Sequence, residues 1–187
     1  MKRKLTLSNG LYYELAFMIC AVLWGRFFKH PMFADFRLTL NAVIIGVLAT
    51  IPLLTFFIWA SKSKIPVLVH HRTLMDSLMP FVLGGWSVIQ LVILSLAAGV
   101  AEEALFRDAI QGGLAERIGT PFAIILASAL FGASHMLTWT YGILAALIGV
   151  YLGVLYVLTG NLLAPMITHF LYDAVFLIWS LKGQRRE

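Results

Sequence analysis

The 187-residue chain is poor in charge, and this shortage excludes most soluble architectures. Charged residues make up 12% of the sequence and hydrophobic residues 60%, whereas an ordinary soluble domain has about 25% charged residues. The mean hydropathy is +0.89. A soluble globule needs more charge than this on its surface, and a disordered chain needs fewer apolar residues. The composition therefore predicts an integral membrane protein with little mass outside the lipid bilayer.

Cysteine is almost absent too. Cys20 is the only one, so the chain cannot form an intramolecular disulfide. The net charge is +5, but the basic residues stand between or beside apolar runs. This placement is typical of topology signals and of contacts with anionic lipid headgroups, and less so of nucleic-acid binding. We expect the lipid bilayer as a partner, and no nucleic acid.

Long apolar runs predict an all-α fold, a polytopic membrane helix bundle with about six transmembrane helices in a single membrane domain, 1–187. The expected spans are 11–28, 38–60, 81–111, 121–139, 141–159 and 162–181. The first two are predicted to be accessory, and the last four form a core at 81–181. The basic segment 61–80 is expected to lie at the membrane interface. Within it, His70 and His71 are expected to be solvated surface side chains.

The distribution of basic residues predicts that both termini are cytoplasmic. With six spans, nine basic residues then lie on the cytoplasmic side of the membrane and four on the opposite side, and Arg107 lies deeper in the membrane. The inside set is Lys2, Arg3, Lys4, Lys62, Lys64, Arg72, Lys182, Arg185 and Arg186, and the outside set is Arg26, Lys29, Arg37 and Arg117.

Six ionisable residues lie within the last four apolar segments, where each costs roughly 2.5–3.5 kcal/mol on insertion scales. They are Glu102, Glu103, Arg107, His135, His169 and Asp173. Such a cost requires that they be paired or hydrated inside the bundle. At about 1.5 Å of rise per residue, three helices place an acid or an imidazole near the middle third of the membrane. We expect the six side chains to converge on one site.

Helical spacing assigns different partners to the two adjacent glutamates. Glu103 and Arg107 are four residues apart and can form an ion pair along one helix. Glu102 is turned by about 100° from Glu103 and is expected to have a different role. Asp108 and Glu116 are expected to be solvated loop charges.

The two later histidines also have neighbours at helical spacing. Asp173 lies four residues after His169 and could hold its ring or add a polar group to the same cavity. Phe131 lies four residues before His135, on the same helix face, where it could wall the site.

A glutamate with two histidines permits three chemistries. A buried carboxylate can take a proton from water while one imidazole positions that water and the other stabilises an oxyanion. Two histidines and a glutamate also form a known catalytic zinc set, although the His-Glu-x-x-His helix signature is absent. A proton-coupled transporter could use the same groups as a relay.

Three motifs together resemble a known family. They are Glu102-Glu103-x-x-x-Arg107, Phe131-x-x-x-His135 and His169-x-x-x-Asp173, and they are similar to those of the CPBP family. This is the CAAX protease and bacteriocin-processing family, or Abi family, of intramembrane glutamic endopeptidases. The match covers about residues 80–181 in the family's order and spacing. It departs at Asp173, where the prenyl-protein branch commonly has asparagine.

The resemblance implies a helical membrane fold in which the motif helices form a conical cavity. It implies that Glu102 acts as general base on a water and that His135 helps to bind and activate that water. His169 and Asp173 would line the oxyanion site, and the remaining charged residues of the first motif would support the helix geometry. We expect no cofactor and no metal, with zinc as the alternative.

The resemblance also implies a membrane-associated peptide or protein substrate and a bacterial inner-membrane location. The substrate could be a lipid-anchored protein, a C-terminal sorting tail or a bacteriocin-like peptide. Two other function classes stay open at this point. A non-catalytic immunity or scaffold protein could keep the same bundle, and a proton-coupled carrier could use the same Glu/His relay.

Overall fold

The structure is a computed structural model that describes residues 6–83 and 85–184. Within this part of the chain every regular element is a helix, as the composition predicts. In chain order the elements are α1 (Leu7–Phe28), α2 (Leu40–Lys62), α3 (Pro66–Leu83), α4 (Val88–Glu103), η1 (Ala104–Gly112), α5 (Gly113–Ile118), α6 (Thr120–Ser134), α7 (Trp139–Thr159) and α8 (Leu163–Gln184). The element η1 is a π-helix that continues directly from α4.

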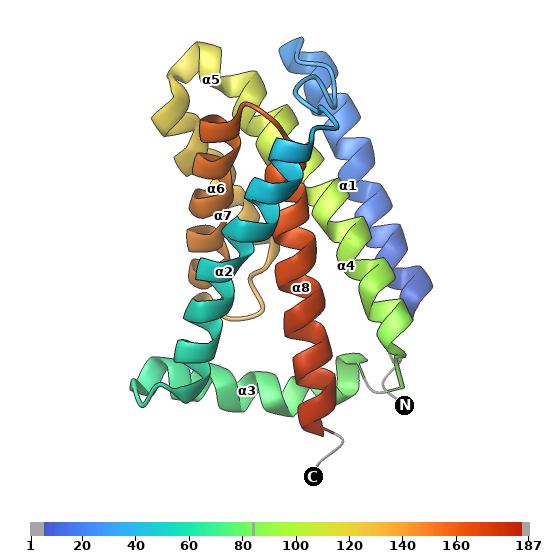
Figure 1. The fold of residues 1–187 in the computed structure, drawn as a ribbon, viewed down its shortest axis with the longest axis vertical. Coiled ribbons are helices and arrows are strands. Elements are labelled where there is room, and N and C mark those ends of the chain that lie inside the picture. Colours follow the sequence, from blue (N-terminus) through green and yellow to red (C-terminus); the bar gives the residue numbers. More distant parts are fainter. Residues whose placement is uncertain (1–5, 84, 185–187) are drawn as a thin grey trace.

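Five helical stretches in the described part of the chain are long and apolar enough to cross a membrane. They are α1, α2, the 31-residue stretch Val88–Ile118, α7 and α8. The remaining expected span, 121–139, is shorter than predicted, because α6 has 15 residues and ends at Ser134. At about 1.5 Å per residue it is about 22 Å long, less than the hydrocarbon core of about 30 Å. The connection from α6 to α7 therefore lies within the height of the bundle, above the level of α3 (Figure 1).

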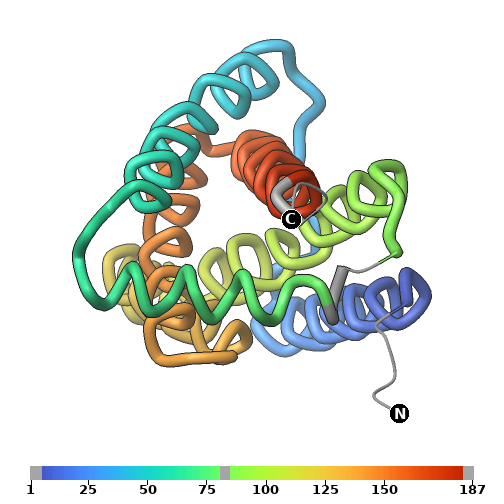
Figure 2. The backbone as a smooth tube through the Cα atoms, turned by 90° about the horizontal axis from the view of Figure 1, so that it is seen from below, coloured from blue at the N-terminus to red at the C-terminus, as the bar shows by residue number. Residues whose placement is uncertain are grey.

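Helix α3 runs across one end of the bundle, roughly perpendicular to the long helices (Figures 1 and 2). This is the arrangement expected for the interfacial segment 61–80. The Arg72 guanidinium donates a hydrogen bond to the backbone carbonyl of Ser61 and so ties α3 to the end of α2.

Helix α1 begins and α8 ends at the end of the bundle that α3 crosses (Figure 1). An even number of crossings is consistent with this arrangement. Five of the basic residues that predict the orientation, Lys2, Arg3, Lys4, Arg185 and Arg186, lie outside the described residues. The cytoplasmic position of both termini therefore stays a prediction.

Two glycines allow close packing of the helices that carry the motifs. A Cβ atom on Gly99 of α4 would lie 3.0 Å from the carbonyl oxygen of Met166 and from the backbone nitrogen of Phe170 in α8. A Cβ atom on Gly132 of α6 would lie 2.5 Å from the carbonyl oxygen of Gly142 in α7. Small residues permit this approach of helix backbones in membrane bundles. Glu102 and His135 each follow one of these glycines by three residues, so the close contacts position both.

Asp108 is fully buried, which corrects the expectation of a solvated loop charge. The helix continues through it as η1, and its carboxylate accepts a hydrogen bond from the backbone N–H of Phe33 in the loop between α1 and α2. Its other oxygen lies 3.2 Å from the His30 Nε2. Phe33 has a φ of 65°, which is uncommon for a side chain of this size. Asp108 thus fastens this loop to η1, whereas Glu116 is exposed, as expected.

Candidate active site

Glu102 and His135 meet near the ends of α4 and α6. The Glu102 side chain is buried, and its Oε2 lies 3.6 Å from the Nε2 of His135, beyond the length of a hydrogen bond. The His135 Nδ1 lies 2.9 Å from the carbonyl oxygen of Phe131. A carbonyl only accepts, so we assign the ring proton to Nδ1, which leaves a lone pair on Nε2 of the neutral ring. An acceptor nitrogen and a carboxylate oxygen therefore face each other, and a group with two O–H donors suits the space beside them.

Glu103 points to different partners, as the angular offset between the two glutamates predicts. Its Oε1 lies 2.8 Å from the Nδ1 of His169, and its Oε2 lies 3.1 Å from the Nε of Arg107. Both Glu103 and Arg107 are fully buried. The ion pair forms even though η1 is a π-helix and not the expected α-helix. Short π-helical stretches are frequent at functional sites. Glu103 thus anchors His169 from one side.

Phe131 joins the two histidines and the arginine. Its ring centroid lies 4.5 Å from that of His135 and 5.8 Å from that of His169. The Arg107 Cζ lies 4.6 Å from the same centroid, on the ring face. The guanidinium therefore gains a cation–π contact as well as the carboxylate. Phe131 walls the site, as its spacing predicts.

Asp173 lies on the more open side of the site. Its Oδ2 is 3.5 Å from the Nε2 of His169, and its side chain is 29% exposed against 5% for His169. The predicted pair at helical spacing is therefore present. His169 lies with one ring nitrogen at Glu103 and the other at Asp173. All six ionisable residues named from the sequence are linked in pairs around one phenylalanine ring.

The sequence reasoning missed a seventh ionisable residue, Glu14 of α1. It is 8% exposed, and its charge interacts with those of His169 and Asp173. Glu102 interacts with it too. The signal was available, since Glu14 is an acid within the first apolar run and is subject to the same insertion cost. Helix α1, which packs against α4 and η1, therefore brings a further buried acid to the helices that carry the first motif.

A second missed contact involves His71 of α3, which was expected to be a solvated side chain. Its ring stacks on Tyr141 at a centroid distance of 5.8 Å, and Tyr141 in turn lies 5.9 Å from the His135 ring. Burial, with a smaller effect of the His70 charge, lowers the pKa of His71. The expectation was therefore wrong for His71, although His70 is exposed. The interfacial helix reaches the wall of the site through this aromatic stack.

A separate cluster in the described part of the chain has the spacing of metal ligands. One ligand atom each from His30, Asp35 and Asp108 lies within 4.8 Å of the others. These atoms already have partners, since the Asp35 carboxylate accepts a hydrogen bond of 2.6 Å from the Tyr156 hydroxyl and Asp108 binds the loop. The hydrogen bond with Asp108 raises the pKa of His30, against the effect of burial. We interpret the cluster as a fastening between the α1–α2 loop and the helices.

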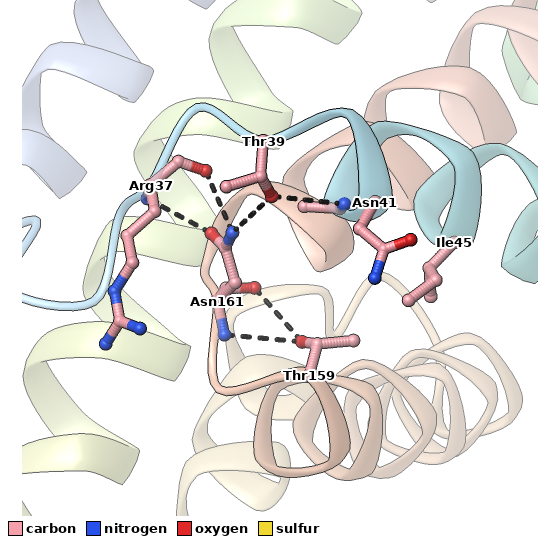
Figure 3. Close-up of a pocket in the computed structure, with 7 residues that line it drawn as sticks. Arg37, Thr39, Asn41, Ile45, Thr159 and Asn161 are labelled. Atoms are coloured by element: carbon pink, nitrogen blue, oxygen red, sulfur yellow. Dashed lines mark hydrogen bonds between the residues drawn. The ribbon is translucent and has the colours of Figure 1, made fainter.

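A pocket of about 260 Å³ lies beside the start of α2 and the α7–α8 junction (Figure 3). Its lining contains no acid and no histidine. Asn161 holds the loop there, because its side chain accepts a hydrogen bond from the backbone N–H of Arg37 and donates to the carbonyl of the same residue. Thr39 and Thr159 complete the network drawn in Figure 3. The pocket is therefore a structural feature of the loop, separate from the Glu/His cluster.

Fold and site together define a polytopic membrane protein with paired acids and imidazoles buried between its helices. Residues 84–175 match the family of type II CAAX prenyl endopeptidases described as Rce1-like. This segment, about half of the chain, contains the three motifs, and the match confirms the resemblance to the CPBP family that these motifs indicate.

One curated relative is the Bacillus subtilis protein YpbD, which is described as uncharacterised. The two are 37% identical over 93 residues, which are 48% of this chain and 45% of YpbD. The chain thus spans less than half the length of this relative. No solved structure matches the chain.

Proposed function

We propose that the protein is an intramembrane endopeptidase that hydrolyses a peptide bond by means of a water activated by Glu102 and His135. The observation that carries the proposal is the pair of facing acceptors, Glu102 Oε2 and His135 Nε2, which lie 3.6 Å apart. A water that donates one O–H to each would present its lone pair to a substrate carbonyl. This is the geometry that general-base hydrolysis requires.

The reaction follows from these positions. Glu102 accepts a proton from the water as the water oxygen attacks the carbonyl carbon, and His135 holds the second O–H. The tetrahedral intermediate then loses the amine as the C–N bond breaks and the nitrogen gains a proton, which the proton that Glu102 took from the water replaces in the site. The water hydroxyl stays in the new carboxyl group. The Nδ1–H of His135 remains on the carbonyl of Phe131, so the ring keeps its orientation throughout.

His169 is suited to stabilise the developing oxyanion. Its Nδ1 is held by Glu103, whose charge is in turn held by Arg107. Its Nε2 faces the open side near Asp173, where an N–H could be directed at the oxyanion. Glu103 and Arg107 support the ring and take no direct part in the chemistry.

The zinc alternative fits the geometry less well. A zinc set of Glu102, His135 and His169 would need one free nitrogen of His169 directed at the ion, with Zn–N distances of about 2.0–2.1 Å. Both nitrogens of that ring face carboxylate acceptors, Glu103 and Asp173, so we assign a hydrogen to each of them, which leaves no lone pair for an ion. We therefore propose a mechanism without a metal cofactor.

For the substrate we propose a membrane-associated peptide or protein: a lipid-anchored protein, a C-terminal sorting tail or a bacteriocin-like peptide. We propose the inner membrane of a bacterium as the location, with both termini cytoplasmic. The family's description names prenylated CAAX proteins, and a farnesylated CAAX peptide is accordingly one of the probes.

A complementation experiment tests the function. The gene is deleted in its host, and mass spectrometry compares membrane-associated peptides after complementation with the wild-type chain, Glu102→Gln or Glu116→Gln. Glu116 is exposed and serves as the matched control. We expect uncleaved substrates with the deletion and with Glu102→Gln only. A scaffold or immunity role predicts that Glu102→Gln complements fully. A carrier predicts proton-coupled uptake in vesicles and no change in peptide processing. Either result would contradict the proposal.

A further inference from the structure

One face of α1 forms a wall of the site. The buried residues of this helix are Gly10, Glu14, Ala21 and Gly25, which recur at helical spacing. This helix packs against α4 and η1, which carry the first motif. Phe17, three residues after Glu14, lies with its ring 5.7 Å from that of Phe106, which is 5.2 Å from the Phe131 ring. Glu14 is the only acid of α1 and lies on the face that packs against the motif helices.

The Glu14 carboxyl group has no fixed partner in the described part of the chain. Its Oε2 is buried and makes no hydrogen bond to any described residue. Its charge interacts with those of His169 and Asp173 on α8 and of Glu102 on α4. A buried carboxylate without a partner is strongly unfavourable. The group must therefore hold a proton or meet a ligand.

A count of the charges in the site indicates that a proton, and not a ligand, neutralises the Glu14 carboxyl group. Four carboxyl groups share the site, and two of them have cationic partners. Arg107 balances Glu103, and His169 balances Asp173 when both of its ring nitrogens donate. Glu14 and Glu102 remain, and the imidazole beside Glu102, His135, is assigned as a neutral ring with its one proton on Nδ1, toward the Phe131 carbonyl. Two interacting buried carboxyl groups without a cation cannot both be ionised, so at least one of them holds a proton.

We propose that Glu14 is a second catalytic carboxyl group, the proton donor to the leaving amine. This inference rests on the proposed hydrolysis. Glu102, ionised, takes a proton from the attacking water, and the hydroxyl joins the carbonyl carbon. Glu14, protonated, gives its proton to the amide nitrogen as the C–N bond breaks, which releases a neutral amine. The pair again holds one proton, now on Glu102, and a water molecule carries it back to Glu14 before the next turnover.

The kinetic test uses Glu14→Gln, because glutamine keeps the shape of a protonated carboxyl group but cannot donate its proton. The probes are a farnesylated CAAX peptide, the same peptide without lipid, and an ester of the same acyl segment with a nitrophenol leaving group. A nitrophenolate departs without a proton, so only peptide cleavage needs the donor. We expect kcat on the peptide to fall about 10²- to 10⁴-fold, with little change in KM and near wild-type cleavage of the ester. Glu116→Gln should match the wild type on every probe.

Two kinetic results would overturn the proposal. If Glu14→Gln lost peptide and ester cleavage together, Glu14 would be structural. If peptide cleavage were unchanged, Glu14 would have no role in the reaction. If the wild type cleaved none of the probes, the donor role would fall together with the proposed function, and the shared proton would be judged by the following measurement alone.

The shared proton is measured without any substrate. Infrared spectra of the protein in lipid vesicles at neutral pH should contain the C=O stretching band of a protonated carboxylic acid. We expect this band to vanish in Glu14→Gln and to persist in Glu102→Gln. A wild-type spectrum without the band, or a band unchanged in Glu14→Gln, would overturn the assignment of the proton to Glu14, whatever the protein cleaves.

Discussion

Replacing Arg107 by methionine should destabilise the bundle and disorganise the site at the same time. Arg107 and Glu103 are both fully buried, and 3.1 Å separates the guanidinium Nε from the carboxylate. Methionine keeps much of the stem volume and removes the charge. Glu103 is then left as a buried anion with His169 as its remaining partner.

The size of the effect follows from these contacts. Breaking a buried ion pair by removing one partner costs about 3–5 kcal/mol, because the other charge stays desolvated. The contact of the Arg107 guanidinium with the Phe131 ring, at 4.6 Å, is a second loss of about 0.5–2 kcal/mol. These two losses are coupled, so we expect a total nearer 4 than 6 kcal/mol.

A double-mutant cycle measures the ion pair directly. The free energy of unfolding in mixed micelles is compared for the wild type, Arg107→Met, Glu103→Gln and the double variant. We expect the double variant to be more stable than Arg107→Met, since no unpaired charge remains. A loss below about 1 kcal/mol for Arg107→Met, with full activity, would show that the pair is incidental and would refute this reasoning.

Three further predictions concern the loop fastening, the helix contact and the oxyanion side. The raised pKa of His30 means that its protonated form is favoured in the folded state. Its stabilisation should therefore be complete below the unfolded pKa of about 6.5 and be lost as the pH rises through the folded pKa. The difference in Tm between wild type and His30→Gln should shrink with rising pH, and a difference that grew would contradict this sign. In Gly132→Ala the new Cβ would lie 2.5 Å from the Gly142 carbonyl, so α6 and α7 must separate. We expect a loss of about 1–3 kcal/mol in stability together with reduced activity, whereas Ala133→Ser, on an exposed neighbour, should have little effect. Asp173→Asn should retain substantial activity, because an amide can still donate on the oxyanion side; kcat of the purified variant checks this, and complete inactivity would exclude that role.

The pairs along single helices could be predicted from the sequence, because helical spacing needs no tertiary information. Glu103 with Arg107 and His169 with Asp173 are both present, the former even in a π-helix. The convergence of the motif helices was also predictable, since isolated charges at membrane depth are unfavourable. The structure was needed to show which histidine faces which glutamate, because these contacts join different helices.

The features that were missed depend on contacts between distant segments or on local capping. Asp108 follows a helical run and precedes two glycines, which suggests a loop, but its partners His30 and Phe33 lie more than 70 residues earlier. The early end of α6 has a local cause. The Ser134 hydroxyl and the His135 Nδ1–H both donate to the carbonyl of Phe131, which takes the place of a further backbone hydrogen bond, and the helix ends at Ser134.

The central claim, that Glu102 acts as a base through water, is tested most directly by Glu102→Gln in purified protein. Glutamine preserves the size of the side chain but cannot accept the proton. We predict that this variant folds with wild-type helix content and Tm and binds the peptide substrate, but has no detectable cleavage. We also predict that neither this variant nor the active wild type contains stoichiometric zinc. Cleavage by Glu102→Gln at a substantial fraction of the wild-type rate, or zinc in the wild type whose removal abolishes activity and whose return restores it, would contradict the account.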